Sequence, residues 1–550
     1  MFARKLLLLT CVLSLGTLPS ARSPFTPPAP QRQNVKLPPE VSQAIKDADQ
    51  RFLTHLGPLE EDVLSFQVSP CGIIHPDVAP TPPPPPSPSS TFVTTDAHWV
   101  SPVDIVLGPV TVGAGVTNLI IESLGGSVEL NGLIVLTDHR TNLIVRAPGV
   151  IFVRGGVQGV TPAGVVPVTG TTTTTAPNVG VLERGNHGEN GGLIGFDASS
   201  IFVEADIFGQ SGGHATNFVL ATDAGGPLAL TVAASGNGGA GGNVYFCYDD
   251  CLVLNDAVQV RAGDGGRPSG HVEALASNSP GGTALAYYTR GGRGGNVAFD
   301  AKSPFVSVAR IELGGPNAAF IAGTGGEPPG QSGFLTGLLA RAVNNSPDGN
   351  AVAKRYPSVS TDKRAAAGGE IQFFGKTAVS DTTFTQLGPA NVKDAFRPGL
   401  GAEGFHAQAI GGDGADDLDG HDSGYAVALG QDGGDPGNLA NGMALDIPYE
   451  VFFPVQLFTL KKTIQDARPT LAGPGGDAEA SNGGGGDGTP PSGMGGAQNW
   501  KYCRGGRAGN TGPIPPRDYG EFMPAVPPTG STGGLAVPNL PLVCLGMHPL

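Results

Sequence analysis

Pairs of glycine residues recur in front of short apolar stretches, and this feature constrains the fold of the chain more than any other. The pattern Gly-Gly-x-(Val/Ile)-x-Phe begins at residues 191, 241, 294 and 368, and Ala-Gly-x-Gly-Gly begins at residues 262, 322 and 472. An apolar residue and a phenylalanine two positions apart share one face of a β-strand. Glycine permits positive φ and close backbone approach. We therefore expect strand–glycine corner–strand units that bury their apolar faces by stacking.

The expected fold class is all-β, as an irregular parallel β-helix (a β-solenoid) with long Gly-rich loops, plus a short helical N-terminal region. The unequal spacing of the four glycine pairs excludes tight hexapeptide or nonapeptide coils for most of the chain. A β-propeller is the alternative. Polyproline-II-like packing of the glycine runs would need a strict three-residue period, which the sequence does not show.

Composition limits the function classes. Glycine and proline account for 87 and 50 of the 550 residues, yet 39% of the chain is hydrophobic, so a sizeable core can form between glycine-rich turns. Only 14% of residues are charged, and the formal net charge is -15. Nucleic-acid binding requires basic patches, so we exclude nucleic acid as a partner.

The chain divides into five segments by composition. Arg4 and Lys5 precede an apolar run and small residues, as in a secretory signal peptide, and no later stretch is apolar enough to span a membrane in the mature chain. A threonine run at 169–176 is interpreted as a loop. The expected segments are a signal peptide (1–21), a helical or irregular region (22–79), a Pro-rich linker (80–99), a repeat-containing β body (100–472) and a Gly/Pro-rich C-terminal region (473–550).

Export favours disulfide bonds. Five cysteines remain if Cys11 leaves with the signal peptide. Cys247 and Cys251 are close enough in sequence to close a local loop, and Cys503 could pair with Cys544 in the C-terminal region. Sequence alone does not fix this connectivity.

One acidic glycine-rich stretch is a candidate metal site. Residues 411–419 fit the nonapeptide G-G-x-G-x-D-x-U-x and resemble one repeat of the calcium-binding RTX family. The resemblance implies calcium ligands at Asp413, Asp416 and Asp419. Calcium takes six to eight oxygens, so a single repeat does not complete a site. The alternative is a solvated acidic loop, and the chain requires no other cofactor.

No cluster of residues predicts catalysis. Asp249 and Asp250 lie between two cysteines and are interpreted as a turn tip. No histidine or arginine stands at a spacing that would complete an acid–base pair with them. We therefore assign no catalytic residue and lean against an enzyme.

In its style of sequence, the stretch from about residue 100 to 480 resembles bacterial glycine-rich surface proteins with solenoid bodies. The resemblance implies a structural or adhesive protein, secreted or held on the extracellular face of the cell envelope. Envelope polysaccharide or other surface proteins would be its partners. Two alternatives stay open: a secreted polysaccharide lyase or hydrolase on the same scaffold, and a calcium-stabilised exported binding protein.

Overall fold

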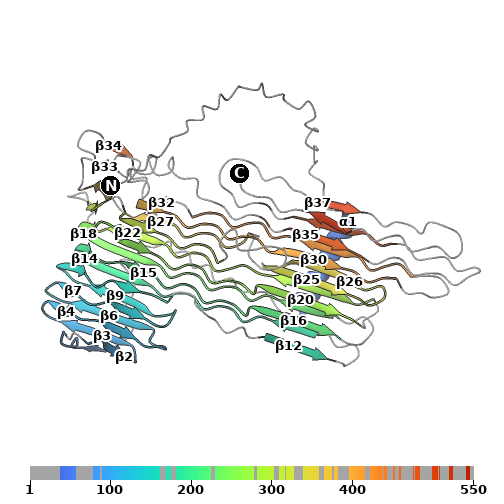
Figure 1. Ribbon diagram of the computed structural model, residues 1–550, viewed down its shortest axis with the longest axis horizontal. Helices are drawn as coiled ribbons and strands as arrows, with labels where there is room; N and C mark the ends of the chain where they lie inside the picture. The colour runs from blue at the N-terminus through green and yellow to red at the C-terminus, as the bar shows by residue number, and fades with distance from the viewer. Residues whose placement is uncertain are drawn as a thin grey trace, which may run out of the picture. The chain divides into compact units, whose positions relative to one another are not determined.

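The computed structural model defines a chain of mainly parallel β-strands with one α-helix (Figure 1). All described residues belong to one compact unit, Leu37–Leu550. The signal peptide expected at 1–21 lies outside them. The structure describes residues 38–56, 79–86, 89–160, 169–174, 181–223, 230–277, 281–302, 309–315, 317–326, 338–357, 364–374, 377–381, 395–414, 421–437, 439–441, 450–452, 457–459, 475, 477–482, 498–505, 507, 520–523 and 541–544.

The strands form four sheets, which we name A to D. Sheet A contains β1 (Pro80–Thr81), β3 (Ala97–Ser101), β4 (Ile105–Leu107), β6 (Asn118–Ser123), β7 (Val128–Leu130), β9 (Asn142–Arg146), β10 (Val150–Val153), β14 (Ile194–Val203), β18 (Val244–Leu254), β22 (Val297–Ala301), β23 (Ala309–Leu313), β27 (Ile371–Phe374), β28 (Thr377–Asp381), β32 (Leu439–Asn441), β33 (Glu450–Phe452) and β34 (Leu457–Thr459). Sheet B contains β2 (Thr91–Val93), β5 (Val110–Val112), β8 (Ile134–Leu136), β11 (Val157–Gln158), β15 (Ile207–Phe208), β19 (Gln259–Arg261), β24 (Ala319–Ile321) and β29 (Phe396–Arg397).

Sheets C and D begin later in the chain. Sheet C contains β12 (Thr169–Thr174), β16 (Phe218–Asp223), β20 (His271–Ala276), β25 (Leu339–Asn344), β30 (His406–Ile410), β35 (Ala478–Ser481) and β38 (Leu542–Cys544). Sheet D contains β13 (Val181–Arg184), β17 (Leu230–Ala234), β21 (Thr283–Tyr288), β26 (Asn350–Arg355), β31 (Ala426–Leu429), β36 (Lys501–Arg504) and β37 (Gly520–Met523). The threonine run is thus strand β12 and not a loop, in keeping with the β-branched threonine side chain.

The chain runs through the sheets repeatedly, and we call each such run a pass. Successive passes stack in register. In sheet B, Val110 pairs with Ile134, Ile134 with Val157, and Val157 with Ile207, all in parallel. The step along the chain lengthens between Val157 and Ile207 because the chain now also visits sheets C and D before it returns. These parallel pairings differ from the antiparallel blades of the β-propeller alternative.

Sheets A and B share the larger hydrophobic core. The glycine-pair motif predicts that its Val or Ile and its Phe point to one side, and Val244, Phe246, Val297 and Phe299 are all fully buried in this core. Phenylalanine rings of successive passes stack, with Phe246 and Phe299 centroids 5.9 Å apart. The two-residue period of the motif is therefore confirmed as strand structure.

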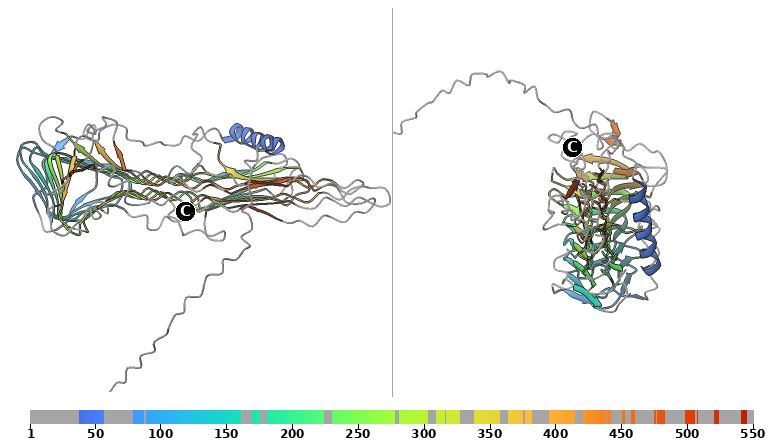
Figure 2. Two further views of the ribbon diagram at one scale, coloured as in Figure 1. Left: turned by 90° about the horizontal axis from the view of Figure 1, so that it is seen from above. Right: turned by 90° about the vertical axis from the view of Figure 1, so that its right-hand side faces the viewer.

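The second core, between sheets C and D, is built mainly from alanine. Small side chains on both facing sheets allow a thinner core than the roughly 10 Å of ordinary sheet packing. Figure 2 shows the two sheets as adjacent thin layers. The buried alanines of this core are Ala221, Ala233, Ala274, Ala276, Ala284, Ala286, Ala340, Ala342, Ala351, Ala353, Ala407, Ala409, Ala426, Ala428, Ala478 and Ala480.

Glycine-rich segments connect the two cores, and we call them the glycine layers. Backbone donors recur in them at every third residue: the amides of Gly209, Gly212 and Ala215 donate to carbonyls of the following pass. Other amides donate across to the facing segment, as Gly266 does to Gly239 at 2.7 Å. The outgoing segments include 209–217, 262–270 and 322–326, and the returning segments include 185–193, 235–243 and 289–296.

The glycines of these layers are required for close approach and not for positive φ. A Cβ atom on Gly266 would clash with the carbonyl oxygen of Gly213, and one on Gly292 with that of Gly239, in each case on the preceding pass. Positive φ among the described glycines occurs at Gly115, Gly156 and Gly281, none of which lies in the layers. The expectation of glycine corners is therefore wrong: the glycine pairs form extended, hydrogen-bonded segments with a three-residue donor period.

Segments near the two ends of the described chain add edge strands to sheets A, C and D. β1 pairs with β3 through Pro80 and Thr81, so the proline tract expected as a linker begins as an edge strand, where a missing amide is tolerated. At the other end, β37 and β38 pair antiparallel with β36 and β35. The Gly/Pro-rich C-terminal region, 473–550, therefore contains strands.

Helix α1 (Pro39–Leu56) covers the outer face of sheet D, as Figure 2 shows. Val41, Ala48 and Phe52 recur at helical spacing and pack against apolar residues of that sheet. The Phe52 ring lies 4.4 Å from that of Tyr287. The helical N-terminal region predicted from the sequence is present.

We expect that Phe52→Ala loosens the helix from sheet D. Phe52 is fully buried, and its truncation leaves a cavity that costs about 3 kcal/mol. Leu53→Ala, at a neighbouring residue that is 40% exposed, is the control. Limited proteolysis should cut near the helix faster in Phe52→Ala only. Equal cleavage of both variants would show that the helix docks without this ring.

Candidate functional site

The calcium candidate lies between β30 and β31. Asp413 is exposed, and its backbone carbonyl accepts a hydrogen bond from the Asp348 amide at 2.9 Å. The Gly412 amide is hydrogen-bonded to the backbone of a neighbouring pass, so it stacks like other glycine pairs. Asp416 and Asp419 lie outside the described residues, and no group of three or more His, Cys, Asp or Glu within the described ranges could hold a metal ion. Calcium binding here stays a prediction.

The cysteines pair differently from the expectation in one case. A disulfide joins Cys503 to Cys544, with 5.9 Å between their Cα atoms. Cys251 carries a free thiol, so the expected link from Cys247 to Cys251 is wrong. Both residues lie on strand β18. Four residues of extended strand span about 13 Å, beyond the reach of a disulfide. Cys247 is disulfide-bonded to a partner outside the described residues.

The acidic pair expected at a turn tip lies within the same strand. Asp249 and Asp250 are exposed, and the register between β14 and β18 shifts between Ala198 and Ser200. One extra residue in β18 therefore forms a β-bulge, which points side chains away from the sheet. The two aspartates face solvent and do not converge with an acid–base partner in the described part of the chain.

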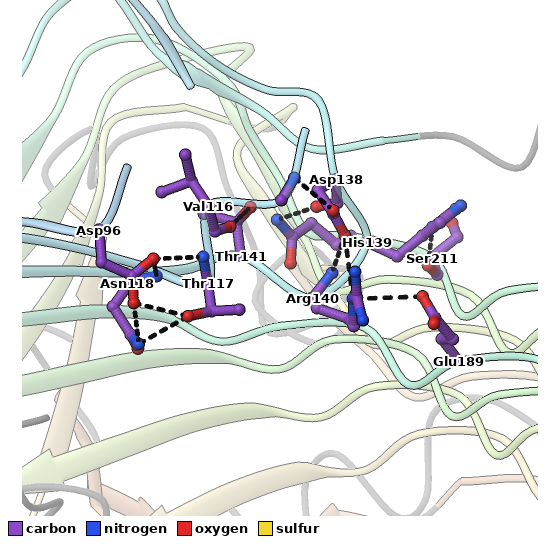
Figure 3. Close-up of polar contacts among 12 residues, drawn as sticks. Asp96, Val116, Thr117, Asn118, Asp138, His139, Arg140, Thr141, Glu189 and Ser211 are labelled. Carbon is purple, nitrogen blue, oxygen red and sulfur yellow. Dashed lines mark hydrogen bonds and ion pairs between the residues drawn. The ribbon is translucent and has the colours of Figure 1, made fainter. Parts of the chain in front are cut away.

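A polar cluster lies where the short passes end and the glycine layers begin (Figure 3). The Gly192 amide donates to the His139 carbonyl at 2.5 Å, and the Gln210 side-chain amide donates to the Asp138 carbonyl at 3.0 Å. His139 Nδ1 lies 2.8 Å from the Ser211 carbonyl oxygen. Since a carbonyl only accepts, Nδ1 carries the proton. The turn at 138–141 thus caps the first glycine layers.

Charged side chains hold this turn in place. Arg140 Nε lies 3.4 Å from Asp138 Oδ1 and 3.2 Å from Glu189 Oε2, as Figure 3 shows. Asp138 also accepts the Gly115 amide at 2.9 Å. Burial alone would raise the pKa of Asp138, but hydrogen bonds from Arg140 and Gly115 lower it below its ordinary value. The carboxylate is therefore ionised at neutral pH and acts as an acceptor.

Asp96 likewise accepts hydrogen bonds that hold the preceding pass in place. Its carboxylate accepts the Thr117 amide and the Thr117 hydroxyl, both at 2.7 Å, and the Asn118 side-chain amide at 3.0 Å. Burial would raise the pKa of Asp96, yet these hydrogen bonds outweigh it and lower the pKa. This polar cluster satisfies backbone amides at an edge, which is a structural task.

The same task is performed by a row of side chains at the start of sheet A strands. The third position of the glycine-pair motif supplies them: Asn243 accepts the Asn296 amide at 2.7 Å, and Asn296 accepts the Glu370 amide at 2.8 Å. In the previous passes, Asn142 accepts the Leu193 amide. Sequence reasoning missed this role, although the recurring Asn in Gly-Gly-Asn-Val was visible.

A histidine takes this role in sheet C. His406 is buried, and its Nδ1 accepts the Asp477 amide at 2.9 Å. Burial lowers the pKa of His406, while the carboxylates of Asp477 and Glu403, 3.5 and 3.8 Å from the ring nitrogens, act in the opposite direction. The folded chain therefore favours the neutral ring.

We expect the free energy of unfolding to fall as the pH drops below about 6.5, the ordinary histidine pKa. The unfolded chain protonates His406 at a higher pH than the folded chain, so protons favour unfolding in this window. His406→Asn keeps an acceptor for the Asp477 amide but does not titrate. Urea unfolding between about pH 5 and 8 should show a smaller pH dependence in this variant. An unchanged slope would contradict the prediction.

Within the described residues, no helix has the length and apolar character needed to cross a membrane. Comparison of the chain with protein-family models, curated proteins and solved structures finds no match.

Proposed function

We propose that the chain is an exported, non-catalytic structural or adhesive protein of the cell envelope, and that its body is a β-solenoid. The observation that carries the proposal is the glycine layers. Successive passes of the same layer lie so close that they leave no space for a Cβ atom at Gly239, Gly266 or Gly292. Segments of this kind supply shape and stiffness but no side chains, which suits a support better than a catalytic pocket.

Parallel stacking supports the solenoid proposal. Each pass pairs with the one before and the one after, as β14 does with β9 and β18. Stacked repeats present their outer side chains in rows about 4.8 Å apart. Such rows offer regular surfaces to extended partners, and we propose envelope polysaccharide or other surface proteins.

Cell fractionation tests this function. An epitope-tagged chain, expressed in its native cell, should be recovered in the envelope or medium and should be digested by protease added to intact cells. The purified chain should leave envelope polysaccharide at its original length. Retention inside the cell would contradict the proposal, and release of new reducing or unsaturated chain ends would favour the lyase or hydrolase alternative.

A further inference from the structure

Two phenylalanines form an outward-facing stack on sheet A. Phe152 of β10 and Phe202 of β14 are register neighbours, with ring centroids 5.2 Å apart and planes inclined by 20°. Their sequence neighbours Ile151 and Val153 are buried in the core, so the two rings lie on the opposite, outer face. Both rings are partly exposed. Aromatic rings in this position are not needed to fill the core.

Polar side chains surround the two rings. The Arg154 guanidinium lies 4.7 Å from the centre of the Phe152 ring. Arg154 also contacts the Glu129 carboxylate at 2.8 Å, the Asn131 side-chain oxygen at 3.3 Å and the Glu204 carboxylate at 3.6 Å. The polar groups beside the rings therefore include two carboxylates, one amide and one guanidinium, with a surplus of negative charge. We call Phe152, Phe202 and these four residues the outer-face platform.

The chemistry of the platform selects its partner. The partly exposed side of the two stacked rings offers an apolar surface to the C–H groups on one side of a sugar ring. Carboxylate, amide and guanidinium groups beside the rings match sugar hydroxyls as hydrogen-bond partners. The negative surplus, on a chain of net charge -15, disfavours polyanions. A periodic strand face also fits a periodic polymer.

We propose that the outer-face platform binds a glycan chain that lacks acidic groups. The proposal rests on the exported, adhesive function above and names the partner class. The sugar chain packs its C–H groups against the exposed side of the two stacked rings, and Glu129, Asn131 and Glu204 accept hydrogen bonds from its hydroxyl or amino groups.

Isothermal titration with defined hexasaccharides tests the platform. The probes are cellohexaose, chitohexaose and its deacetylated form, with hexagalacturonate as the acidic counterpart. The wild-type chain should bind at least one non-acidic probe more tightly than hexagalacturonate. Phe152→Ala and Phe202→Ala should each weaken that binding about tenfold. Phe92→Ala removes a ring that is 65% exposed on sheet B and should leave binding unchanged.

Three outcomes would overturn the proposal: no non-acidic probe binds, hexagalacturonate binds best, or the platform variants bind like wild type. If an alanine variant fails to fold by circular dichroism, Phe202→Leu removes the aromatic face with less loss of volume and should show the same weakening. Fractionation of cells that express the Phe202 variant separates the two proposals. Normal export without glycan binding would defeat the platform alone.

Discussion

Replacing Gly292 with alanine is expected to destabilise the chain by about 3 kcal/mol or more, at the upper end of overpacking effects. The new Cβ atom would clash with the carbonyl oxygen of Gly239 on the preceding pass of the same layer. The Gly292 amide also donates to the Gly266 carbonyl of the facing segment at 2.8 Å, so a shift of Gly292 that relieves the clash would strain that bond. Urea unfolding followed by circular dichroism should show a lower midpoint.

Gly195→Ala is the matched control for this substitution. Gly195 lies on strand β14, and apart from Gly195 and its two chain neighbours no residue has an atom within 4 Å of the position that its Cβ would take. Loss of glycine also reduces the entropy of the unfolded chain, which stabilises by about 0.4–1 kcal/mol where space and φ permit. We expect this variant to be equal to or slightly more stable than wild type. Equal stabilities for the Gly292 and Gly195 variants would show that successive passes can move apart freely at the glycine layers.

The difference between these two glycines shows what the sequence could not predict. Glycine pairs indicate either positive φ or close backbone approach, and both require the same residue. The choice depends on what faces the glycine, and Gly292 meets a segment more than 50 positions earlier in the chain. The strands after the glycine pairs were predictable because Val297 and Phe299 encode their period locally.

The alanine core illustrates a signal that the sequence contained and that was missed. Alternating alanines occur at Ala340 and Ala342, and again at Ala351 and Ala353, with the two-residue period of a strand. Alanine has weak β-propensity and little apolar surface, so the pattern carries less weight than valine or phenylalanine. The facing sheet explains the alternating alanines, because only small side chains fit between closely packed layers.

The polar cluster at the start of the glycine layers was unpredictable for a different reason. His139 and Ser211 are far apart in sequence, and neither belongs to a recognisable motif. His139 and Ser211 meet because of the number of residues in each pass. No sequence motif shows where a pass begins or ends. The asparagine row is the exception, since Asn243 and Asn296 occupy the same place in a repeated motif.

Truncation of Phe299 to alanine is expected to cost about 3–5 kcal/mol, the usual range for a fully buried phenylalanine. Its ring lies 4.8 Å from Phe320 and 5.0 Å from Phe373, so it joins the core side of sheet A to that of sheet B. Deletion of the ring leaves a cavity and removes contacts on several sides at once. Urea unfolding, monitored by far-ultraviolet circular dichroism, should report the loss as a lower midpoint.

Phe92→Ala and Phe299→Leu are the two controls for Phe299→Ala in the core between sheets A and B. Phe92 is 65% exposed, so its truncation should change the free energy of unfolding by less than about 0.5 kcal/mol. Phe299→Leu retains most of the volume but no aromatic ring, and it should cost less than the alanine variant. Because stacked passes contact mainly their neighbours, damage at Phe299 weakens the passes on either side of it. A Phe299→Ala chain as stable as Phe92→Ala would mean that the passes do not depend on one another for their stability.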